Sequence, residues 1–103
     1  MVKVVAIVRR KAGMTVEVFQ EHWRTHHADV VARLPGLRRY VQSHTLPSGY
    51  GKGEPVWDGI AELWVDDTDA LRALRGSAEH GAVDADEARF LDRGAMTTRK
   101  PRC

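Results

Sequence analysis

The stretch TVEVFQEHWRTHHADVVARLPGLRRYVQSHTL, residues 15–46, decides the fold, because it holds the clearest helix of the chain, its stop signal and a following strand. At about 100° per residue its apolar side chains form one stripe of an amphipathic helix. The stripe consists of Val16, Phe19, Trp23, Val30 and Leu34. Thr15 is a candidate N-cap, and Pro35-Gly36 prevents continuation. The pattern predicts a helix over 15–34 that packs on a sheet.

The three histidines of this helix project in different directions. His27 points into the apolar stripe, His26 lies at its margin and His22 faces solvent. Burial lowers the pKa of an imidazole, and a neutral imidazole at pH 7 is a usable general base. The alternative is a core histidine whose nitrogens are satisfied by a carbonyl or a side chain.

The length and composition predict one small domain and give no sign of a polyanionic partner. We expect the domain to span 1–99 and the basic end, 100–103, to be a flexible tail. A net charge of +2 does not indicate a nucleic-acid partner. Cys103 is the single cysteine, so no internal disulfide is expected and a cytoplasmic location is favoured. The opening run VKVVAIV is too short to cross a membrane.

The order of predicted elements defines the fold class. Strands are predicted over 2–9, 37–46, 57–65 and 95–99, and helices over 15–34, 69–75 and 77–91. Segment 47–55 is rich in glycine and proline and is expected to be a loop that could serve as a lid. The order βαββαβ is typical of the α+β, ferredoxin-like fold, in which an antiparallel sheet carries its helices on one face.

The strand over 57–65 has two different faces. One is purely apolar and suits the helices; it consists of Gly59, Ala61, Leu63 and Val65. The other consists of Asp58, Ile60, Glu62 and Trp64. This second face, joined by Tyr40 or Val41 according to register, is too apolar for solvent and predicts a homodimer that pairs two sheets.

Six motifs stand out in the sequence: RRK at 9–11, GMT at 13–15, FxxxWxxxHA at 19–28, LPGLRRYVQ at 34–42, WDGIAELW at 57–64 and DEARFLD at 86–92. Together they resemble the EthD family of the dimeric α/β-barrel superfamily. The pieces occur in the family's order and spacing over nearly the whole chain. Asp29 stands where the family pattern usually carries proline.

The resemblance implies a function class and a set of site residues. Relatives in the superfamily include lactone isomerases, polyketide cyclases and cofactor-free monooxygenases. We therefore expect a cofactor-independent isomerase, lyase or cyclase that acts on a small, partly apolar carbonyl or lactone compound in a degradative or secondary-metabolite pathway. The alternatives are a non-catalytic accessory protein that binds such a metabolite and a cofactor-free monooxygenase.

Two residues are candidates for catalysis. The resemblance marks His27 as the family's helix histidine, the one that the helical wheel also selects, and we expect it to act as acid or base. Tyr40 is a recurrent polar strand position, and it either donates a hydrogen bond to a developing oxyanion or packs with its hydroxyl in solvent. Further candidates for substrate binding are Trp23, His44, Asp58, Glu62 and Phe90.

Two of these candidates are carboxylates, and their spacing limits what they can do. Asp58 and Glu62 lie about 13 Å apart along a strand and cannot share a proton. Each could instead bind an arginine across the dimer, which we favour for Glu62.

A metal or cofactor is not expected. His22 and His26 are four residues apart, which suits two ligands on one helical face, but no zincin glutamate lies between them. The glycine-rich segment 48–53 is not followed by a helix that could bind phosphate. The expected partners are a small-molecule ligand or substrate and a second copy of the chain.

Overall fold

The structure is a computed structural model that describes residues 1–51 and 53–99. Its elements are β1 (Val2–Val8), α1 (Val16–His22), the π-helical turn η1 (Trp23–His27), α2 (Ala28–Ala32), β2 (Arg39–His44), α3 (Pro47–Tyr50), β3 (Gly59–Val65), α4 (Thr68–Arg75), α5 (Ala78–Phe90) and β4 (Thr97–Arg99). The predicted order βαββαβ is confirmed, with one helical turn, α3, inside the predicted loop. The predicted tail, 100–103, lies outside the described residues.

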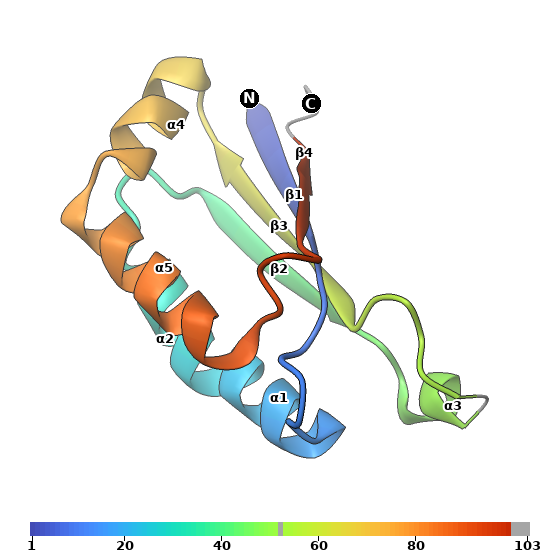
Figure 1. The fold of residues 1–103 in the computed structure, drawn as a ribbon. Helices are drawn as coiled ribbons and strands as arrows, with labels where there is room; N and C mark the ends of the chain where they lie inside the picture. Colours follow the sequence, from blue (N-terminus) through green and yellow to red (C-terminus); the bar gives the residue numbers. More distant parts are fainter. Residues whose placement is uncertain (52, 100–103) are drawn as a thin grey trace.

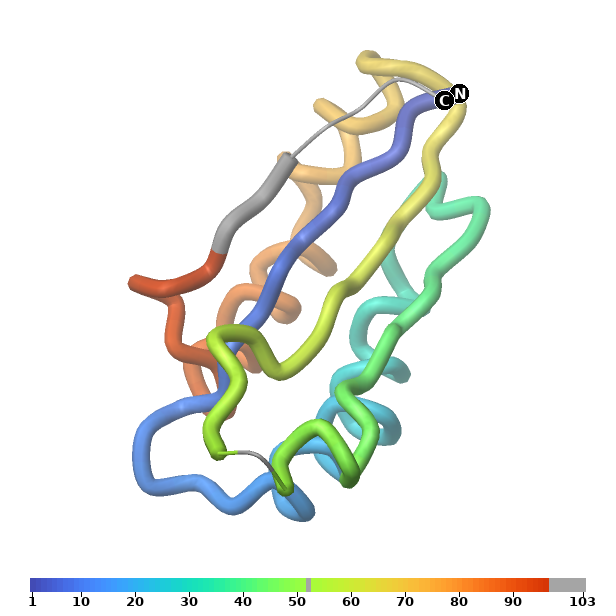
Figure 2. The backbone as a smooth tube through the Cα atoms, turned by 90° about the vertical axis from the view of Figure 1, so that its right-hand side faces the viewer, coloured from blue at the N-terminus to red at the C-terminus, as the bar shows by residue number. Residues whose placement is uncertain are grey.

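The four strands form one antiparallel sheet in the order β2-β3-β1-β4. Figure 1 shows α1, α2 and α5 on one side of this sheet. In Figure 2, turned by 90°, the strands lie in front of the helices, so the viewer looks at the uncovered face. This is the ferredoxin-like arrangement with helices on one face.

The two faces of β3 are assigned as the sequence predicts. Ala61 and Val65 are 7% and 1% exposed beneath the helices, whereas Ile60 is 39% exposed on the open face. The register pairs Ile60 with Ile7 and Ser43, and Trp64 with Lys3 and Arg39. Val41, which pairs with Glu62, therefore shares the open face, and Tyr40 turns to the helices.

The first helical segment contains a π turn that the sequence did not predict. Its buried side chains recur at every fourth position, at Phe19, Trp23, His27 and Val31. Four residues exceed one α-helical turn by about 40°, so this stripe would drift by about 120° over twelve residues. The extra residue of a π turn cancels most of that drift, about 100°. The turn at η1 therefore keeps all four side chains directed at the sheet.

Two groups of buried apolar side chains fill the space between sheet and helices. One surrounds Phe19, Trp23 and Phe90, and the other surrounds Val31 and Leu74. A cavity of about 310 Å³ draws its lining from both groups, so it lies where they meet.

Asp58 differs from the prediction that placed it on the open face. It precedes the first residue of β3, so strand alternation does not fix its direction. Its side chain is buried and accepts hydrogen bonds from the Arg10 backbone N–H (2.8 Å), Arg10 Nη1 (2.8 Å) and Tyr50 Oη (2.6 Å). Burial, followed by the hydrogen bond and charge of Asp58, raises the pKa of Tyr50 to about 12, so its hydroxyl remains a donor. Through these hydrogen bonds, Asp58 connects Tyr50 of α3 to Arg10, just after the end of β1.

Candidate functional site

The centre of the candidate site is a buried hydrogen bond between two helices. His27 of η1 and Asp86 of α5 are 4% and 3% exposed, and His27 Nδ1 lies 2.7 Å from Asp86 Oδ2. Because a carboxylate only accepts, we assign the proton to Nδ1, which leaves Nε2 with a lone pair. Burial lowers the pKa of His27, and the hydrogen bond that His27 donates to Asp86 offsets this only in part. A neutral imidazole in this tautomer can accept a proton at Nε2.

Nε2 of His27 is not sealed inside the core. No hydrogen bond to it comes from the part of the chain that the structure describes. Among the same residues, no side-chain nitrogen or oxygen atom is both fully buried and without a partner. The side chain of His27 also lines the cavity. The basic nitrogen therefore has access to the cavity space.

Asp86 gathers two further histidines. His22 Nε2 lies 3.0 Å from both of its oxygens, and His26 Nε2 lies 3.4 Å from Oδ1. The expectation that His22 faces solvent is therefore wrong, since its side chain is 26% exposed and bound to Asp86. Burial alone would raise the pKa of Asp86, but the hydrogen bonds from His27 and His22 outweigh it and hold that pKa below its ordinary value. Asp86 is thus a stable anion that orients His27.

Tyr40 is held by an amide on the same strand face. Gln42 Nε2 donates to Tyr40 Oη at 2.8 Å and to the Trp23 carbonyl at 2.7 Å, which uses both amide hydrogens. His44 Nε2 lies 2.8 Å from Gln42 Oε1 and fixes the orientation of the amide. Because Tyr40 Oη accepts from Gln42, its own proton is available to another acceptor. Burial raises the pKa of Tyr40, against the opposing effect of the Gln42 hydrogen bond, so the hydroxyl stays protonated at neutral pH.

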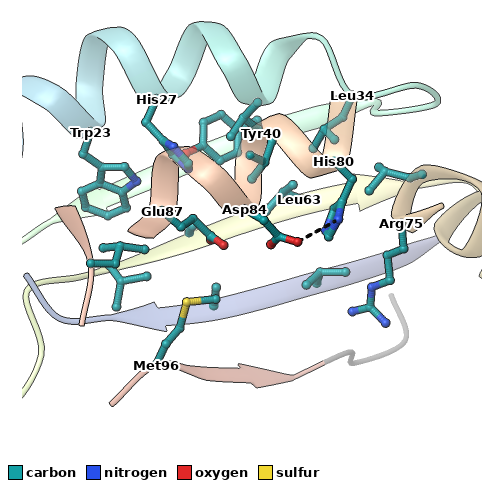
Figure 3. A pocket seen from close by; sticks show the side chains of 18 of the residues that line it. Trp23, His27, Leu34, Tyr40, Leu63, Arg75, His80, Asp84, Glu87 and Met96 are labelled. Atoms are coloured by element: carbon teal, nitrogen blue, oxygen red, sulfur yellow. Dashed lines mark ion pairs between the residues drawn. The ribbon is translucent and has the colours of Figure 1, made fainter. Parts of the chain in front are cut away.

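The cavity is apolar at its base and polar toward α5 and the segment that follows it. Figure 3 shows Trp23, His27 and Tyr40 around one part and Glu87, Asp84 and His80 projecting from α5. Apolar lining comes from the sheet, for example Ala6, Ala61 and Leu63, and from Val31, Leu71 and Val83 of the helices.

Glu87 is the most perturbed carboxyl of the site. Burial raises the pKa of Glu87 to about 7, with Arg93 opposing the shift and Asp84 adding to it. Asp84 itself lies 3.4 Å from Arg93 Nη2 and 3.6 Å from His80 Nδ1. The polar end of the cavity therefore carries a carboxyl that is half protonated near neutral pH.

The predicted site residues separate into three groups. His27, Tyr40 and Trp23 line the cavity. Phe90 and His44 lie behind it: the Phe90 ring centroid is 4.8 Å from that of His27, and the His44 ring is 4.3 Å from Trp23. Asp58 and Glu62 are not brought to the cavity, because Asp58 binds Arg10 and Glu62 binds Lys3 at 3.2 Å on the open face.

Two of the residues that sequence reasoning missed, Asp86 and Gln42, have a periodicity signal in the sequence. Val83, Asp86 and Phe90 are the buried residues of α5 and follow the i, i+3, i+7 spacing of one helix face. Asp86 is thus a carboxylate inside an apolar stripe, the same feature that selected His27. Gln42 follows Tyr40 by two residues and therefore shares its strand face. Glu87 has no such signal, because the shift of its pKa depends on the packing of α5 against the sheet.

The chain does not offer a metal centre or a membrane span in its described part. Within residues 1–51 and 53–99, no group of three or more His, Cys, Asp and Glu side chains could hold a metal ion. The histidines around Asp86 converge on its oxygens rather than on a shared point. None of the described helices is long and apolar enough to cross a membrane.

A comparison with models of known protein families identifies residues 11–94 as an EthD domain. The chain belongs to the EthD family. An EthD family protein from Bacillus halodurans has the same fold at 24% sequence identity and a TM-score of 0.81, with 100% of this chain and 98% of that one covered. The predicted family is therefore confirmed. No curated protein sequence shows significant similarity to this EthD chain.

Other solved structures share the fold of this EthD protein at lower identity. A dimeric ferredoxin-like protein of unknown function from Thermobifida fusca matches at 22% identity and a TM-score of 0.75, covering 99% of this chain and 90% of that one. A putative antibiotic biosynthesis monooxygenase from Nitrosomonas europaea matches at 13% identity and a TM-score of 0.65, covering 100% and 98%. At these identities the likeness establishes the ferredoxin-like fold and leaves the chemistry to be argued from the site.

Proposed function

We propose that this EthD protein is a cofactor-independent acid–base enzyme of the isomerase, lyase or cyclase type that acts on a small, partly apolar carbonyl or lactone compound. The observation that carries the proposal is the 2.7 Å hydrogen bond between His27 Nδ1 and Asp86 on the wall of the cavity. It supplies a base with a fixed tautomer in an apolar setting, where proton abstraction next to a carbonyl is favoured.

Each polar group has a role in this chemistry. His27 Nε2 removes a proton from the carbon next to the carbonyl, and Asp86 stabilises the imidazolium that forms. Tyr40 donates its hydrogen bond to the carbonyl oxygen as negative charge develops there. Gln42 and His44 act through Tyr40, because their hydrogen bonds direct its proton away from Gln42. Trp23 is an apolar wall of the cavity, and Phe90 supports the ring of His27.

The dimensions of the cavity support a small substrate. Its volume of about 310 Å³ is at the lower end of the range for small-molecule sites, about 300 to 1,000 Å³. The apolar part of the lining would bind the hydrocarbon part of a ligand, while the carbonyl oxygen meets Tyr40. This favours a compound of one or two rings.

The base is testable without knowledge of the natural substrate. The probe is 5-nitrobenzisoxazole, in which removal of one C–H proton breaks the N–O bond and releases a coloured phenolate. The variant His27→Asn keeps a donor for Asp86 but has no basic nitrogen, and we expect it to lower the rate by about 10²-fold or more. Asp29→Asn, on the exposed surface of the same helix segment, is the matched control and should keep the wild-type rate.

The same assay separates an enzyme from a binding protein. If the probe stabilises the wild-type protein against heat but its ring opening is no faster than with free imidazole at equal concentration, the protein binds without catalysing. An equal rate in folded His27→Asn and wild type would remove His27 as the base.

We also propose that the open sheet face binds a second copy of the chain. Ile60 is 39% exposed on this face, and Trp64, four residues further along β3 on the same face, has Arg39 and Lys3 at 4.9 and 5.4 Å from its ring. This mixture of apolar surface and paired charges suits a self-complementary interface. The Thermobifida fusca neighbour is described as dimeric, which supports the same assembly here.

Light scattering tests the dimer. We expect a particle of about 23 kDa, twice the 11.5 kDa of one chain. Trp64→Glu should be monomeric or insoluble, whereas Glu17→Gln, at an exposed position of α1, should remain dimeric. A wild-type monomer at micromolar concentration would contradict the proposal.

A further inference from the structure

Glu87 is a titratable group on the cavity wall that the chemistry assigned to His27 does not use. It directly follows Asp86 on α5, so it starts from the same helix turn that holds His27 by a 2.7 Å hydrogen bond. Both Glu87 and His27 line the cavity, and Figure 3 shows them approaching it from different elements, α5 and η1. One ligand in this cavity can therefore meet both groups.

We propose that Glu87 is a second catalytic residue, a general acid that returns a proton to a different carbon, so that the natural substrate class is an enolisable, β,γ-unsaturated carbonyl or lactone compound. The inference rests on the proposed function, because it needs His27 as the base, and it narrows that function to a 1,3-proton shift.

The ionisation states of the two groups fit these opposite roles. Burial raises the pKa of Glu87 to about 7, while burial lowers the pKa of His27 below its ordinary value. The pKa of Glu87 is therefore shifted toward the protonated, acidic form at neutral pH, and that of His27 toward the neutral, basic form. Two groups whose environments push their pKa values in these directions form an acid and a base at the same pH.

The proton shift balances without a further reactant. His27 Nε2 takes the proton from the carbon between the carbonyl and the double bond, and the electron pair of that C–H bond forms a dienolate. Tyr40 donates to the dienolate oxygen. The γ carbon then takes the carboxyl proton of Glu87, so one C–H bond breaks, one forms, and the double bond becomes conjugated. Exchange with water returns the proton from His27 and reprotonates Glu87.

Several charged groups face Glu87 and determine where it titrates. Asp84 and Asp86 on α5 raise its pKa, and Arg93, after that helix, lowers it. The other titratable groups around the cavity are His80 of α5 itself, Arg75 of α4, His27 of η1 and Tyr40 of β2. The rate of the isomerisation should therefore follow a bell, rising as His27 loses its proton below about pH 6.5 and falling as Glu87 ionises near pH 7.

The experiment compares two probes on the same variants. Isomerisation of 3-cyclohexen-1-one to 2-cyclohexen-1-one needs both a base and an acid, whereas ring opening of 5-nitrobenzisoxazole needs the base. For Glu87→Gln we expect the ratio of the isomerisation rate to the ring-opening rate to fall by about tenfold or more. Glu79→Gln, at an exposed position of the same helix, is the matched control and should leave that ratio unchanged.

A shift of the pH profile provides a second measurement that a structural role would not produce. Arg93 lowers the pKa of Glu87, so Arg93→Gln should move the alkaline limb of the isomerisation profile to higher pH. Asp84 raises that pKa, so Asp84→Asn should move the same limb to lower pH. Shifts in these two opposite directions support Glu87 as the acid.

The outcomes distinguish this inference from the proposed function. If Glu87→Gln leaves the ratio of rates unchanged, or if the wild type opens 5-nitrobenzisoxazole but does not isomerise 3-cyclohexen-1-one, the role of Glu87 is overturned while His27 remains the base. If His27→Asn affects neither reaction, the proposed function falls and this inference falls with it.

Discussion

The close approach of Gly59 to Trp23 gives a sharp prediction about how the cavity is built. A Cβ atom at position 59 would lie 2.5 and 2.6 Å from Cζ3 and Cη2 of Trp23, and 2.7 Å from the carbonyl oxygen of Ser43. Trp23 is 1% exposed, and the Ser43 carbonyl belongs to the β2 backbone, so neither can retreat freely. Overpacking of this kind costs about 1 to 3 kcal/mol, and we expect Gly59→Ala to reach about 3 kcal/mol.

Thermal unfolding followed by circular dichroism measures this effect. A loss of about 3 kcal/mol corresponds to a fall in Tm of about 12 °C or more for a domain of this size. Gly81→Ala is the matched control, because nothing lies within 4 Å of its Cβ position and the residue is inside α5. There the same substitution should stabilise by about 0.5 to 1 kcal/mol. Equal Tm values for Gly59→Ala and wild type would refute the packing of Trp23 on β3.

Three further predictions concern the charged groups. Asp58→Ala leaves the guanidinium of Arg10, whose side chain is 15% exposed, without its buried partner. We expect it to lower the free energy of unfolding, measured with urea, by about 3 to 5 kcal/mol. Asp66→Ala removes an exposed ion pair with Arg38 and should barely change stability. The pKa of Glu87 is raised from 4.5 to about 7, so between pH 4.5 and 7 the native state binds more protons than the unfolded state. The free energy of unfolding therefore falls as the pH rises through this range. Glu87→Gln should remove this pH dependence and be up to about 3 kcal/mol more stable than wild type by pH 8. A gap between the two proteins that does not close below pH 4.5 would contradict the buried carboxyl. Replacing His27 and Asp86 together by leucine should leave the free energy of unfolding unchanged or raise it. His27→Leu alone should lower it, because this variant removes the strongest partner of the buried Asp86 anion. An equal loss of stability in the double and the single variant would refute this prediction.

The sequence predicted the fold well because each element has a local signal. The Thr15 cap is confirmed by its hydrogen bond from the Val18 N–H, and α4 begins after Asp67, which accepts from the Ala70 N–H. The apolar alternation of residues 59–65 identified the face beneath the helices. These features depend on neighbours in the sequence, so periodicity and capping rules are enough to find them.

The candidate site was predicted only in part, because its chemistry depends on contacts between distant elements. Helical periodicity selected His27, but its partner Asp86 lies 59 positions further along the chain. The predicted placement of Asp58 on the open face is wrong, because this residue precedes the first residue of β3 and strand alternation does not fix the direction of its side chain. The π turn was not predicted either, since the four-residue repeat of buried side chains can be recognised only when burial is known.

A buried His–Asp pair is a poor way to stabilise a small core, and this bears on why it exists here. Removing two polar groups from water costs several kcal/mol, and apolar side chains of similar volume would fill the same space at least as well. The π turn, itself less favourable than a regular helix, directs His27 at the cavity and at Asp86, and it also keeps Phe19, Trp23 and Val31 in the core. Stability does not explain the combination of a desolvated anion and an imidazole nitrogen left open to a cavity. The proton transfer that we propose accounts for it, because such a reaction needs a base whose tautomer is fixed, whose charge is stabilised once it forms and whose free nitrogen can reach a ligand.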